Sequence, residues 1–359
     1  MENKRSNSID LLKTICMFGI LILHFLLQGG ILNNLQNNKI NFSLFWLLEI
    51  LFMCSVNIFA IISGFLYIEK KKYNNKNIVN LIITVVFYSI ITTSIFYIFN
   101  LYNFRMLGIK KILTSLFPPT IGRYWYITSY ILLFFMIPYI NQLISSLNKR
   151  KYRNLIFILT CAFCVFSIFI TKDILKVSYG YSPIWLMYCY LLGGYIKKYG
   201  VNFHKKMILS LNINLIMLLI LKNISVESEL LNKIFNLLIS YNSPFIVLNS
   251  LIIFLFFKDK NITKGKRLIS YLSITSFGVY IIHCHPLIYD YILKNIFNRF
   301  FDVNSILFIV IFVVLLFFVY IICSLIEFLK IKIFKMKLFS RLEQYLTNLI
   351  DKKIGYDAD

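Results

Sequence analysis

The chain has 359 residues, of which 59% are hydrophobic and 15% are charged, and its mean hydropathy is +0.74. This balance excludes a soluble globular domain and indicates an integral membrane protein. Because it contains only 6 prolines and 13 glycines, we expect an all-α polytopic protein and not a β-barrel. The net charge of +23 comes from short basic clusters between apolar runs, which favours contact with anionic membrane lipids over nucleic-acid binding.

Apolar windows between polar breaks predict ten transmembrane helices. Of the 38 Lys and Arg residues, 26 lie at the N-terminus, in the loops after every second helix and in the C-terminal segment. This asymmetry predicts a multi-pass membrane protein with both termini in the cytoplasm. The chain is rich in Asn, Ile, Lys and Phe, which is typical of an AT-rich bacterial genome and indicates a bacterial cell membrane. The basic N-terminus is interpreted as leading into a retained first helix, since no small-residue cleavage site follows. The predicted helices cover residues 9–28, 43–68, 77–100, 124–146, 154–171, 183–199, 205–222, 236–257, 267–293 and 304–330.

The C-terminal segment has a different pattern from the rest of the chain. From Ile331 onward, apolar residues recur at helical spacing with lysines and arginines between them, as Phe334, Leu338 and Leu342 illustrate. This pattern predicts an amphipathic helix on the cytoplasmic membrane surface. We therefore expect a transmembrane domain of residues 1–330 and an amphipathic tail of residues 331–359.

His24 lies in the otherwise apolar first helix. A histidine inside a bilayer must find polar partners or line a wet cavity, so it is a candidate functional residue, and imidazole is the commonest general base. His283 lies equally far from the cytoplasmic end of the ninth helix, so both share a depth of roughly 22 Å. The alternative is that His24, His283 and the nearby His285 only hydrogen-bond neighbouring helices.

The cytoplasmic end of the first helix carries Arg5, Asp10 and Lys13. Asp10 and Lys13 are three residues apart and share a helix face, which is typical of an interfacial ion pair. The functional alternative is a site for a phosphate-bearing ligand, with Arg5 and Lys13 as charged contacts. The basic loop that includes Lys76 is predicted on the same side.

Two further segments carry polar or aromatic side chains. Ser63 and Gly64 in the second helix favour close helix packing, and no nucleophile motif surrounds Ser63. Arg123, Trp125 and Tyr126 lie at the outer end of the fourth helix, where they are typical either of an aromatic belt or of a sugar-binding rim. The sequence contains no metal-ligand motif, phosphate loop or dinucleotide fingerprint.

The order of these segments resembles the membrane acyltransferase 3 family from residue 5 to about residue 330. It is most similar to the branch that O-acetylates bacterial surface polysaccharides. Where relatives often carry paired arginines after the second helix, this chain has Lys76 and Asn80. The matching segments are Arg5, Ser8-Ile9-Asp10-Leu11-Leu12-Lys13 and Leu23-His24-Phe25; Asn57-Ile58-Phe59 and Ile62-Ser63-Gly64-Phe65-Leu66; Tyr124-Trp125-Tyr126-Ile127 and Pro138; and Ser276-Phe277-Gly278-Val279-Tyr280-Ile281-Ile282-His283.

The resemblance implies transfer of an acetyl group from cytoplasmic acetyl-CoA, as co-substrate and not as a bound cofactor, to a hydroxyl of a surface polysaccharide or glycolipid. His24 and Asp10 are then the expected catalytic residues, with Asp10 orienting Arg5 or Lys13. The expected substrate or donor contacts are Arg5, Lys13, Lys76, Ser63, Arg123, Trp125, Tyr126 and His283. The alternatives are a transporter of a small solute such as serine, or a scaffold whose histidines only join helices.

Overall fold

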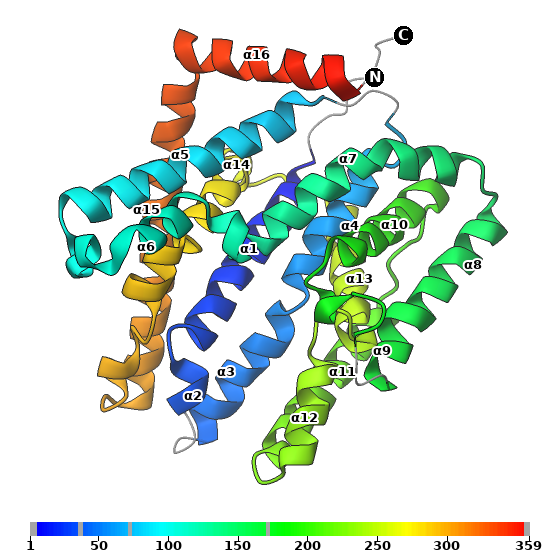
Figure 1. Ribbon diagram of the computed structural model, residues 1–359. Helices are drawn as coiled ribbons and strands as arrows, with labels where there is room; N and C mark the ends of the chain where they lie inside the picture. Colours follow the sequence, from blue (N-terminus) through cyan, green and yellow to red (C-terminus); the bar gives the residue numbers. More distant parts are fainter. Residues whose placement is uncertain (1–5, 35–38, 71–73, 170–172, 355–359) are drawn as a thin grey trace. The chain divides into compact units, whose positions relative to one another are not determined.

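The computed structural model describes residues 6–34, 39–70, 74–169 and 173–354, and Arg5 therefore lies outside the described residues (Figure 1). Within these ranges every regular element is a helix, which confirms the all-α prediction. The chain forms two compact units, and each unit is built from two separate chain segments. Unit 1 comprises residues 1–69 and 135–273, and unit 2 comprises residues 70–134 and 274–359.

The number of membrane-spanning helices can be compared with the prediction. Seven helices in the described ranges are long and apolar enough to cross a bilayer, and eight if the bent pair Lys266–His283 and Ile288–Phe300 is one span. Helix α13 (Pro244–Lys258) is apolar but has only 15 residues. At ~1.5 Å per residue it is roughly 22 Å long, shorter than a hydrocarbon core of roughly 30 Å. The predicted count of ten therefore stays a prediction.

Unit 1 is a helical bundle that holds the first helix of the chain. Helix α7 (Trp125–Ser145) contributes its second half and α14 (Lys266–His283) its first part. The other helices of unit 1 are α1 (Asn7–Leu27), α2 (Ile31–Asn34), α3 (Lys39–Phe52), α4 (Ser55–Tyr67), α8 (Lys149–Thr160), η4 (Cys161–Phe166), α9 (Ser167–Phe169), η5 (Ser178–Gly180), α10 (Pro183–Tyr199), α11 (Lys206–Ser225), α12 (Glu229–Leu238) and α13.

Local capping residues decide where several of these helices begin. Helix α10 begins at Pro183, and the Ser182 hydroxyl accepts a hydrogen bond from the Trp185 amide. Helix α13 begins in the same way at Pro244, after Ser243. A serine before a proline satisfies an otherwise unpaired amide and presets the first turn. The predicted helix at 236–257 therefore starts at the wrong residue. In the structure α12 ends at Leu238, and α13 begins only at Pro244.

The core of unit 1 contains a close contact between α4 and α10. A Cβ added to Gly64 would overlap the carbonyl oxygen of Tyr190, and one added to Gly193 would overlap that of Ile61. The two backbones therefore touch where glycine leaves room, as the interpretation of Gly64 as a packing residue predicts. Ser63, the neighbouring residue, donates its hydroxyl to the carbonyl oxygen of Phe59 in its own helix at 3.1 Å.

Unit 2 contains a sharply bent segment that replaces a predicted continuous helix. Helix α14 ends at His283, and the chain bends by 75° before it continues from Ile288. The predicted span 267–293 is wrong at this point, because Pro286 cannot continue the backbone hydrogen bonds of a helix. The remaining helices of unit 2 are α5 (Lys76–Ile98), η2 (Leu101–Leu107), α6 (Gly108–Leu116), η3 (Pro118–Ile121), η6 (Ile288–Leu293), η7 (Asn298–Phe300), α15 (Ser305–Phe334) and α16 (Lys337–Ile354).

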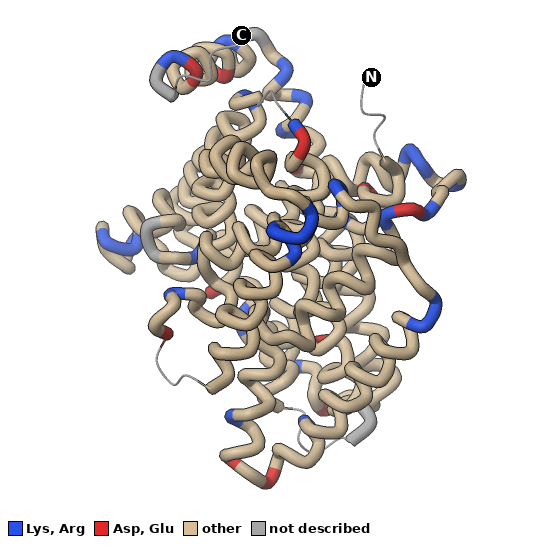
Figure 2. The backbone as a smooth tube through the Cα atoms, turned by 90° about the vertical axis from the view of Figure 1, so that its right-hand side faces the viewer, with Lys and Arg blue, Asp and Glu red and all other residues tan. Residues whose placement is uncertain are grey.

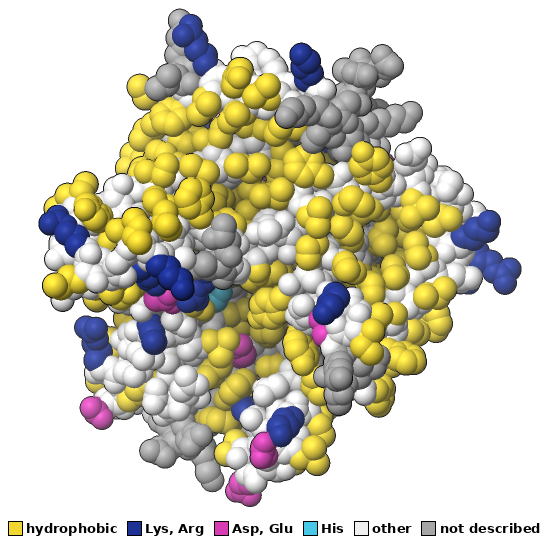
Figure 3. Space-filling model, viewed as in Figure 1, with side chains coloured by type: hydrophobic (Ala, Val, Ile, Leu, Met, Phe, Trp, Pro, Cys, Tyr) yellow, Lys and Arg dark blue, Asp and Glu magenta, His cyan; other side chains and the backbone are white. Residues whose placement is uncertain are grey.

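The surface agrees with insertion into lipid. Apolar side chains cover much of the face shown in Figure 3, and charged residues are sparse along the helices in Figure 2. Exposed apolar residues follow one another at three- or four-residue intervals on α11, as Leu209, Ile213, Ile216, Ile220 and Ile224 show. A continuous apolar face of this size is unfavourable in water and suits contact with lipid chains. The protein is therefore a multi-pass membrane protein.

Candidate active site

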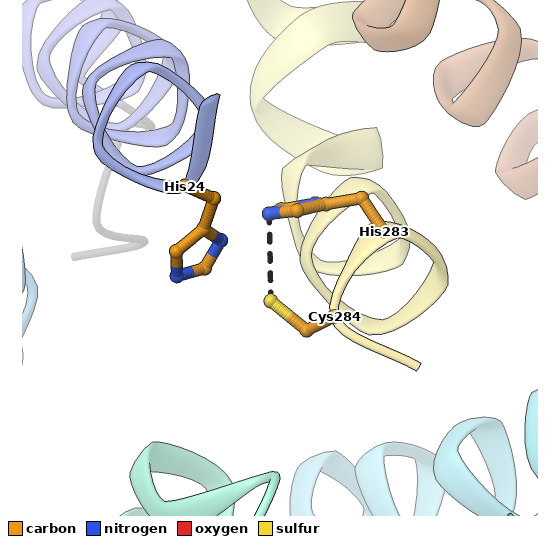
Figure 4. A group of neighbouring side chains, drawn as sticks. All are labelled: His24, His283 and Cys284. Carbon is orange, nitrogen blue, oxygen red and sulfur yellow. Dashed lines mark hydrogen bonds between the residues drawn. The ribbon is translucent and has the colours of Figure 1, made fainter. Parts of the chain in front are cut away.

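His24 lies one turn before the end of α1, in unit 1. Its carbonyl oxygen accepts hydrogen bonds from the amides of Gln28 at 2.9 Å and Gly29 at 3.1 Å, which close the helix end. Leu23 and Phe25 on either side are buried, whereas His24 is partly exposed. Figure 4 shows its imidazole extending away from the α1 backbone. A partly accessible imidazole can exchange a proton with a bound substrate, as a general base must.

Asp10 lies at the opposite end of α1. It is 4% exposed, and its carboxylate accepts a hydrogen bond of 3.0 Å from the Ser273 hydroxyl of α14. His24 follows Asp10 by 14 positions, which correspond to about 21 Å along the helix axis. Asp10 therefore lies too far from His24 to exchange a proton with it directly. Lys13, one turn beyond Asp10, is partly buried.

The predicted donor contact Lys76 begins α5 in unit 2. Its ammonium group forms an ion pair of 3.2 Å with Glu343 of α16, and its side chain is 58% exposed. Next to it, the Asn75 side-chain amide donates a 2.6 Å hydrogen bond to Asp351. Helix α16 is thus held against the start of α5 by polar contacts. An exposed ion pair of this kind contributes little to stability.

Arg123 is held by an acidic partner. Its guanidinium group lies 2.6 Å from the Asp290 carboxylate and packs over the ring of Tyr289 at 5.3 Å. Lys111 of α6 approaches the other oxygen of Asp290 at 3.7 Å. These contacts join α6, the start of α7 and η6 within unit 2. The structure therefore gives Arg123 a structural partner that its sequence position did not reveal.

Trp125 and Tyr126 belong to an aromatic cluster at the start of α7. Their rings meet edge to face with centroids 5.7 Å apart. Tyr126 also stacks on Tyr130 and contacts the edge of Tyr280 on α14, with centroid distances of 6.2 and 6.4 Å. Aromatic rings in this arrangement pack well against each other and offer polar tips to a ligand or to the membrane interface.

His283 and Cys284 at the end of α14 form a hydrogen-bonded pair in unit 2 (Figure 4). His283 Nδ1 lies 2.5 Å from the carbonyl oxygen of Val279, and a carbonyl can only accept, so Nδ1 carries the ring proton. The lone pair of Nε2 is then available to accept the Cys284 thiol proton across 3.4 Å. In this tautomer both ring nitrogens of the fully buried His283 have partners, one a backbone carbonyl and the other a thiol.

His285 has a structural environment. The Leu287 amide donates to His285 Nδ1 at 3.3 Å, so the proton lies on Nε2, which donates to the Ser115 carbonyl oxygen at 3.2 Å. Both ring nitrogens are therefore bonded to backbone groups. His285 connects α6 to the bend after α14 and is the histidine that best fits the helix-joining alternative.

Sequence reasoning missed several buried charged residues. Glu49 on α3, Lys222 on α11 and the pair Glu327 and Lys330 on α15 are all less than 9% exposed. Glu49 is the one acidic residue between positions 41 and 67, so its isolation in an apolar run was a usable signal. Lys222, Glu327 and Lys330 lie near the ends of predicted spans, where charged residues are ordinarily taken as loop residues.

The helices, the apolar surface and the partly exposed histidine at the end of α1 define a multi-pass helical membrane protein with a potential proton-transfer group. A family model described as an acyltransferase domain, that of acyltransferase 3, matches residues 6–328. The chain therefore belongs to the acyltransferase 3 family, as its motif order predicted, and is a membrane acyltransferase. The comparisons with curated proteins and with solved structures each gave no match.

Proposed function

We propose that the protein transfers an acetyl group from cytoplasmic acetyl-CoA to a hydroxyl of a bacterial cell-surface polysaccharide or its lipid-linked precursor. The observation that carries this proposal is His24, a partly exposed imidazole in the first apolar helix of a chain that belongs to an acyltransferase family. A base inside the membrane region is what an acceptor hydroxyl needs, because a neutral hydroxyl is a weak nucleophile.

In the proposed reaction, His24 removes the proton of the acceptor hydroxyl as the hydroxyl oxygen attacks the thioester carbonyl carbon. The new C–O bond forms, the C–S bond breaks, and the imidazolium returns the proton to the departing thiolate of coenzyme A. The acetyl group could instead reside first on His24 as a covalent intermediate, which a second attack by the acceptor would release. Rapid mixing with labelled acetyl-CoA in the absence of acceptor distinguishes the routes, because only the covalent route labels the protein.

The donor end of the proposed site lies at the start of α1. Arg5 and Lys13 would contact the phosphates of coenzyme A, because cationic side chains form strong charge-assisted bonds to phosphate. Asp10 would hold one of these cations in place and take no part in proton transfer. The distance of about 21 Å along α1 between Asp10 and His24 then requires a donor with a long arm, as the pantetheine of acetyl-CoA provides. We retain Lys76 and His283 as proposed contacts of the donor or substrate.

The proposed orientation places the N-terminal end of α1 in the cytoplasm and the His24 end toward the exterior. It rests on the excess of Lys and Arg in alternate loops, which orients helices during insertion. Accessibility of single cysteines to a membrane-impermeant thiol reagent tests it in a variant that lacks the native cysteines. A cysteine at exposed Asn33, near the end of α2, should react from outside, and one at exposed Glu69 should not.

The proposed function is tested by mass spectrometry of surface glycans from a deletion strain complemented with wild type, His24→Ala or His204→Ala. His204 is an exposed loop histidine and serves as a matched control. Wild type and His204→Ala should restore O-acetyl groups, whereas His24→Ala should not, at equal protein levels in the membrane. Full acetylation by His24→Ala would contradict the assignment of the base. Unchanged glycans with altered uptake of a small solute would support the transport alternative.

A further inference from the structure

Unit 1 contains a cavity at the end of the bundle where α1 finishes. Its volume is about 320 Å³, within the range typical of small-molecule sites. Leu32 of α2 lines it and follows His24 by eight residues, so the cavity and the proposed base occur at the same end of α1. The lining residues come from α2, α3, α11, α12 and the α11–α12 turn: Leu32, Phe42, Trp46, Lys222, Ser225, Val226, Glu227, Ser228, Glu229 and Asn232.

Among the charged residues that line the cavity, Lys222 is the least exposed, with 8% of its surface accessible. Its ammonium nitrogen lies 4.2 Å from the ring centre of Trp46 and 5.0 Å from that of Phe235, and it donates a 3.0 Å hydrogen bond to Asn232 Oδ1. The aromatic rings stabilise the cation without neutralising it. Because an ammonium group has three N–H donors and Asn232 takes one, Lys222 retains donors for a further ligand.

The acidic residues of the cavity do not supply the counter-charge. Glu229 pairs with Lys233 at 2.7 Å, and its side chain is 83% exposed. Glu227 is likewise exposed. Among the described residues, no carboxylate lies within ion-pair distance of the Lys222 nitrogen. A buried cation that lacks a counter-ion is costly, so an anionic ligand would gain a strong contact here.

Trp46 provides a second unused donor. Its indole nitrogen is buried and has no hydrogen-bond partner among the described residues. A buried N–H without a partner costs about 1–3 kcal/mol, which a ligand oxygen would recover. The cavity therefore combines a cation, an indole N–H and an amide side chain. This set of groups fits a ligand that has an anionic group and several oxygen atoms, and the cavity is large enough for more than a phosphate ion.

We propose that this cavity binds an anionic sugar unit of the acyl acceptor. The carboxylate or phosphate of the sugar contacts Lys222, and its hydroxyl oxygens accept hydrogen bonds from Trp46 and Asn232. The proposal rests on the proposed function, because it takes the bound sugar to be part of the acceptor. On the orientation proposed above, the cavity lies at the exterior end of unit 1, on the side where a surface polysaccharide is exposed.

The experiment measures binding separately from catalysis. Thermal unfolding of the full-length protein in detergent is followed during titration with glucuronic acid, glucose 1-phosphate, glucose or inorganic phosphate at constant ionic strength. A ligand that binds the folded state raises the unfolding temperature. We expect both anionic sugars to act at concentrations at least about tenfold lower than glucose, which lacks a charge-assisted bond worth about 1.5–3 kcal/mol. They should also act at concentrations about fivefold lower than inorganic phosphate, which lacks the sugar hydroxyls that accept a hydrogen bond from Trp46.

Three variants give this experiment its controls. Lys222→Gln should need at least about tenfold more of either anionic sugar to reach the same rise in unfolding temperature. Trp46→Phe should bind the anionic sugars about fivefold more weakly, because it loses one neutral hydrogen-bond donor. Lys206→Gln, at an exposed position on α11 outside the cavity, should respond like wild type. His24→Ala should also bind normally while it fails to transfer the acetyl group, so failure of either proposal can be recognised without the other.

Several results would overturn the proposal. Equal responses of wild type and Lys222→Gln would remove the assigned cation. If Lys222→Gln does not fold, Trp46→Phe provides the test. A rise in unfolding temperature with anionic sugars equal to that of wild type would then contradict the proposal. Inorganic phosphate as effective as the anionic sugars would show a simple anion site, and glucose as effective as glucuronic acid would remove the charge requirement. No stabilisation of wild type by either anionic sugar would also contradict it.

Discussion

On α15, Glu327 and Lys330 form an ion pair that is buried at both ends, with 2.7 Å between the carboxylate and the ammonium group and side-chain exposures of 4% and 5%. Tyr88 of α5 donates a 2.7 Å hydrogen bond to Glu327, and Lys330 donates a 3.0 Å bond to the Thr84 hydroxyl. The pair thus joins α5 to α15 inside unit 2. Gly278 of α14 leaves the space that Glu327 occupies.

Removing one member of this pair should destabilise the protein strongly. Lys330→Met leaves Glu327 buried without its cation, and we expect the free energy of unfolding to fall by about 3–5 kcal/mol. The double variant Glu327→Gln and Lys330→Met removes both charges, so its free energy of unfolding should fall by less than that of Lys330→Met alone. Unfolding in detergent micelles measures both changes. A double variant that is no more stable than Lys330→Met would show that charge pairing is not the stabilising interaction.

Substitutions at the adjacent residues Ser63 and Gly64 should differ strongly in their effect on stability. Gly64→Val places carbon atoms against the Tyr190 carbonyl and should sharply reduce the amount of folded protein in the membrane. Ser63→Ala loses a hydroxyl bonded within its own helix and should change stability by no more than about 1 kcal/mol. Western blotting and thermal unfolding test this contrast. If Ser63 also contacts the donor, Ser63→Ala should raise the KM for acetyl-CoA.

The pairing of Arg123 with Asp290 allows its structural and substrate-binding roles to be separated. Arg123→Ala and Asp290→Asn should each have a small effect on thermal stability, because the first breaks one partly exposed ion pair and the second breaks that pair and the longer contact with Lys111. A double-mutant cycle should give a coupling energy below about 1 kcal/mol. If Arg123 contacts the acceptor, only Arg123→Ala should also raise the KM for acceptor. An unchanged acceptor KM in both variants would leave Arg123 a structural residue.

Substitution of His285 should reduce stability and not activity, whereas substitution of His24 should reduce activity and not stability. His285→Ala leaves the Ser115 carbonyl and the Leu287 amide without their ring partner at a fully buried position, at a cost of about 1–3 kcal/mol for each group. We expect a lower unfolding temperature and an unchanged kcat per folded molecule. His24→Ala should instead retain most of its stability and lose activity. Loss of kcat in folded His285→Ala would show that His285 contributes to the chemistry.

The apolar runs predicted where helices form but not how each one ends. Local signals explain most of the corrections: Ser243 and Pro244 start α13 late, and Pro286 bends the chain after α14. These residues were visible in the sequence, but a hydropathy average over many residues conceals a single proline or cap.

The candidate site was only partly predictable for a different reason. An isolated His24 in an apolar run is unusual by itself, so one sequence was enough to select it. The partners of Arg123 and Lys222 were not predictable, because Asp290 lies 167 positions from Arg123, and Trp46 lies 176 positions from Lys222. Such pairs depend on how helices pack, which the order of residues along one helix does not specify.

The contact between α4 and α10 has a consequence for how substrates could travel. Because Gly64 lies against the backbone of α10 and Gly193 against that of α4, no side chain and no water-sized gap separates the helices at that level. Neither an acetyl group nor a sugar can pass between them. Any passage through unit 1 must therefore run beside other helices, and a search for it by cysteine labelling can begin with α1 and α3.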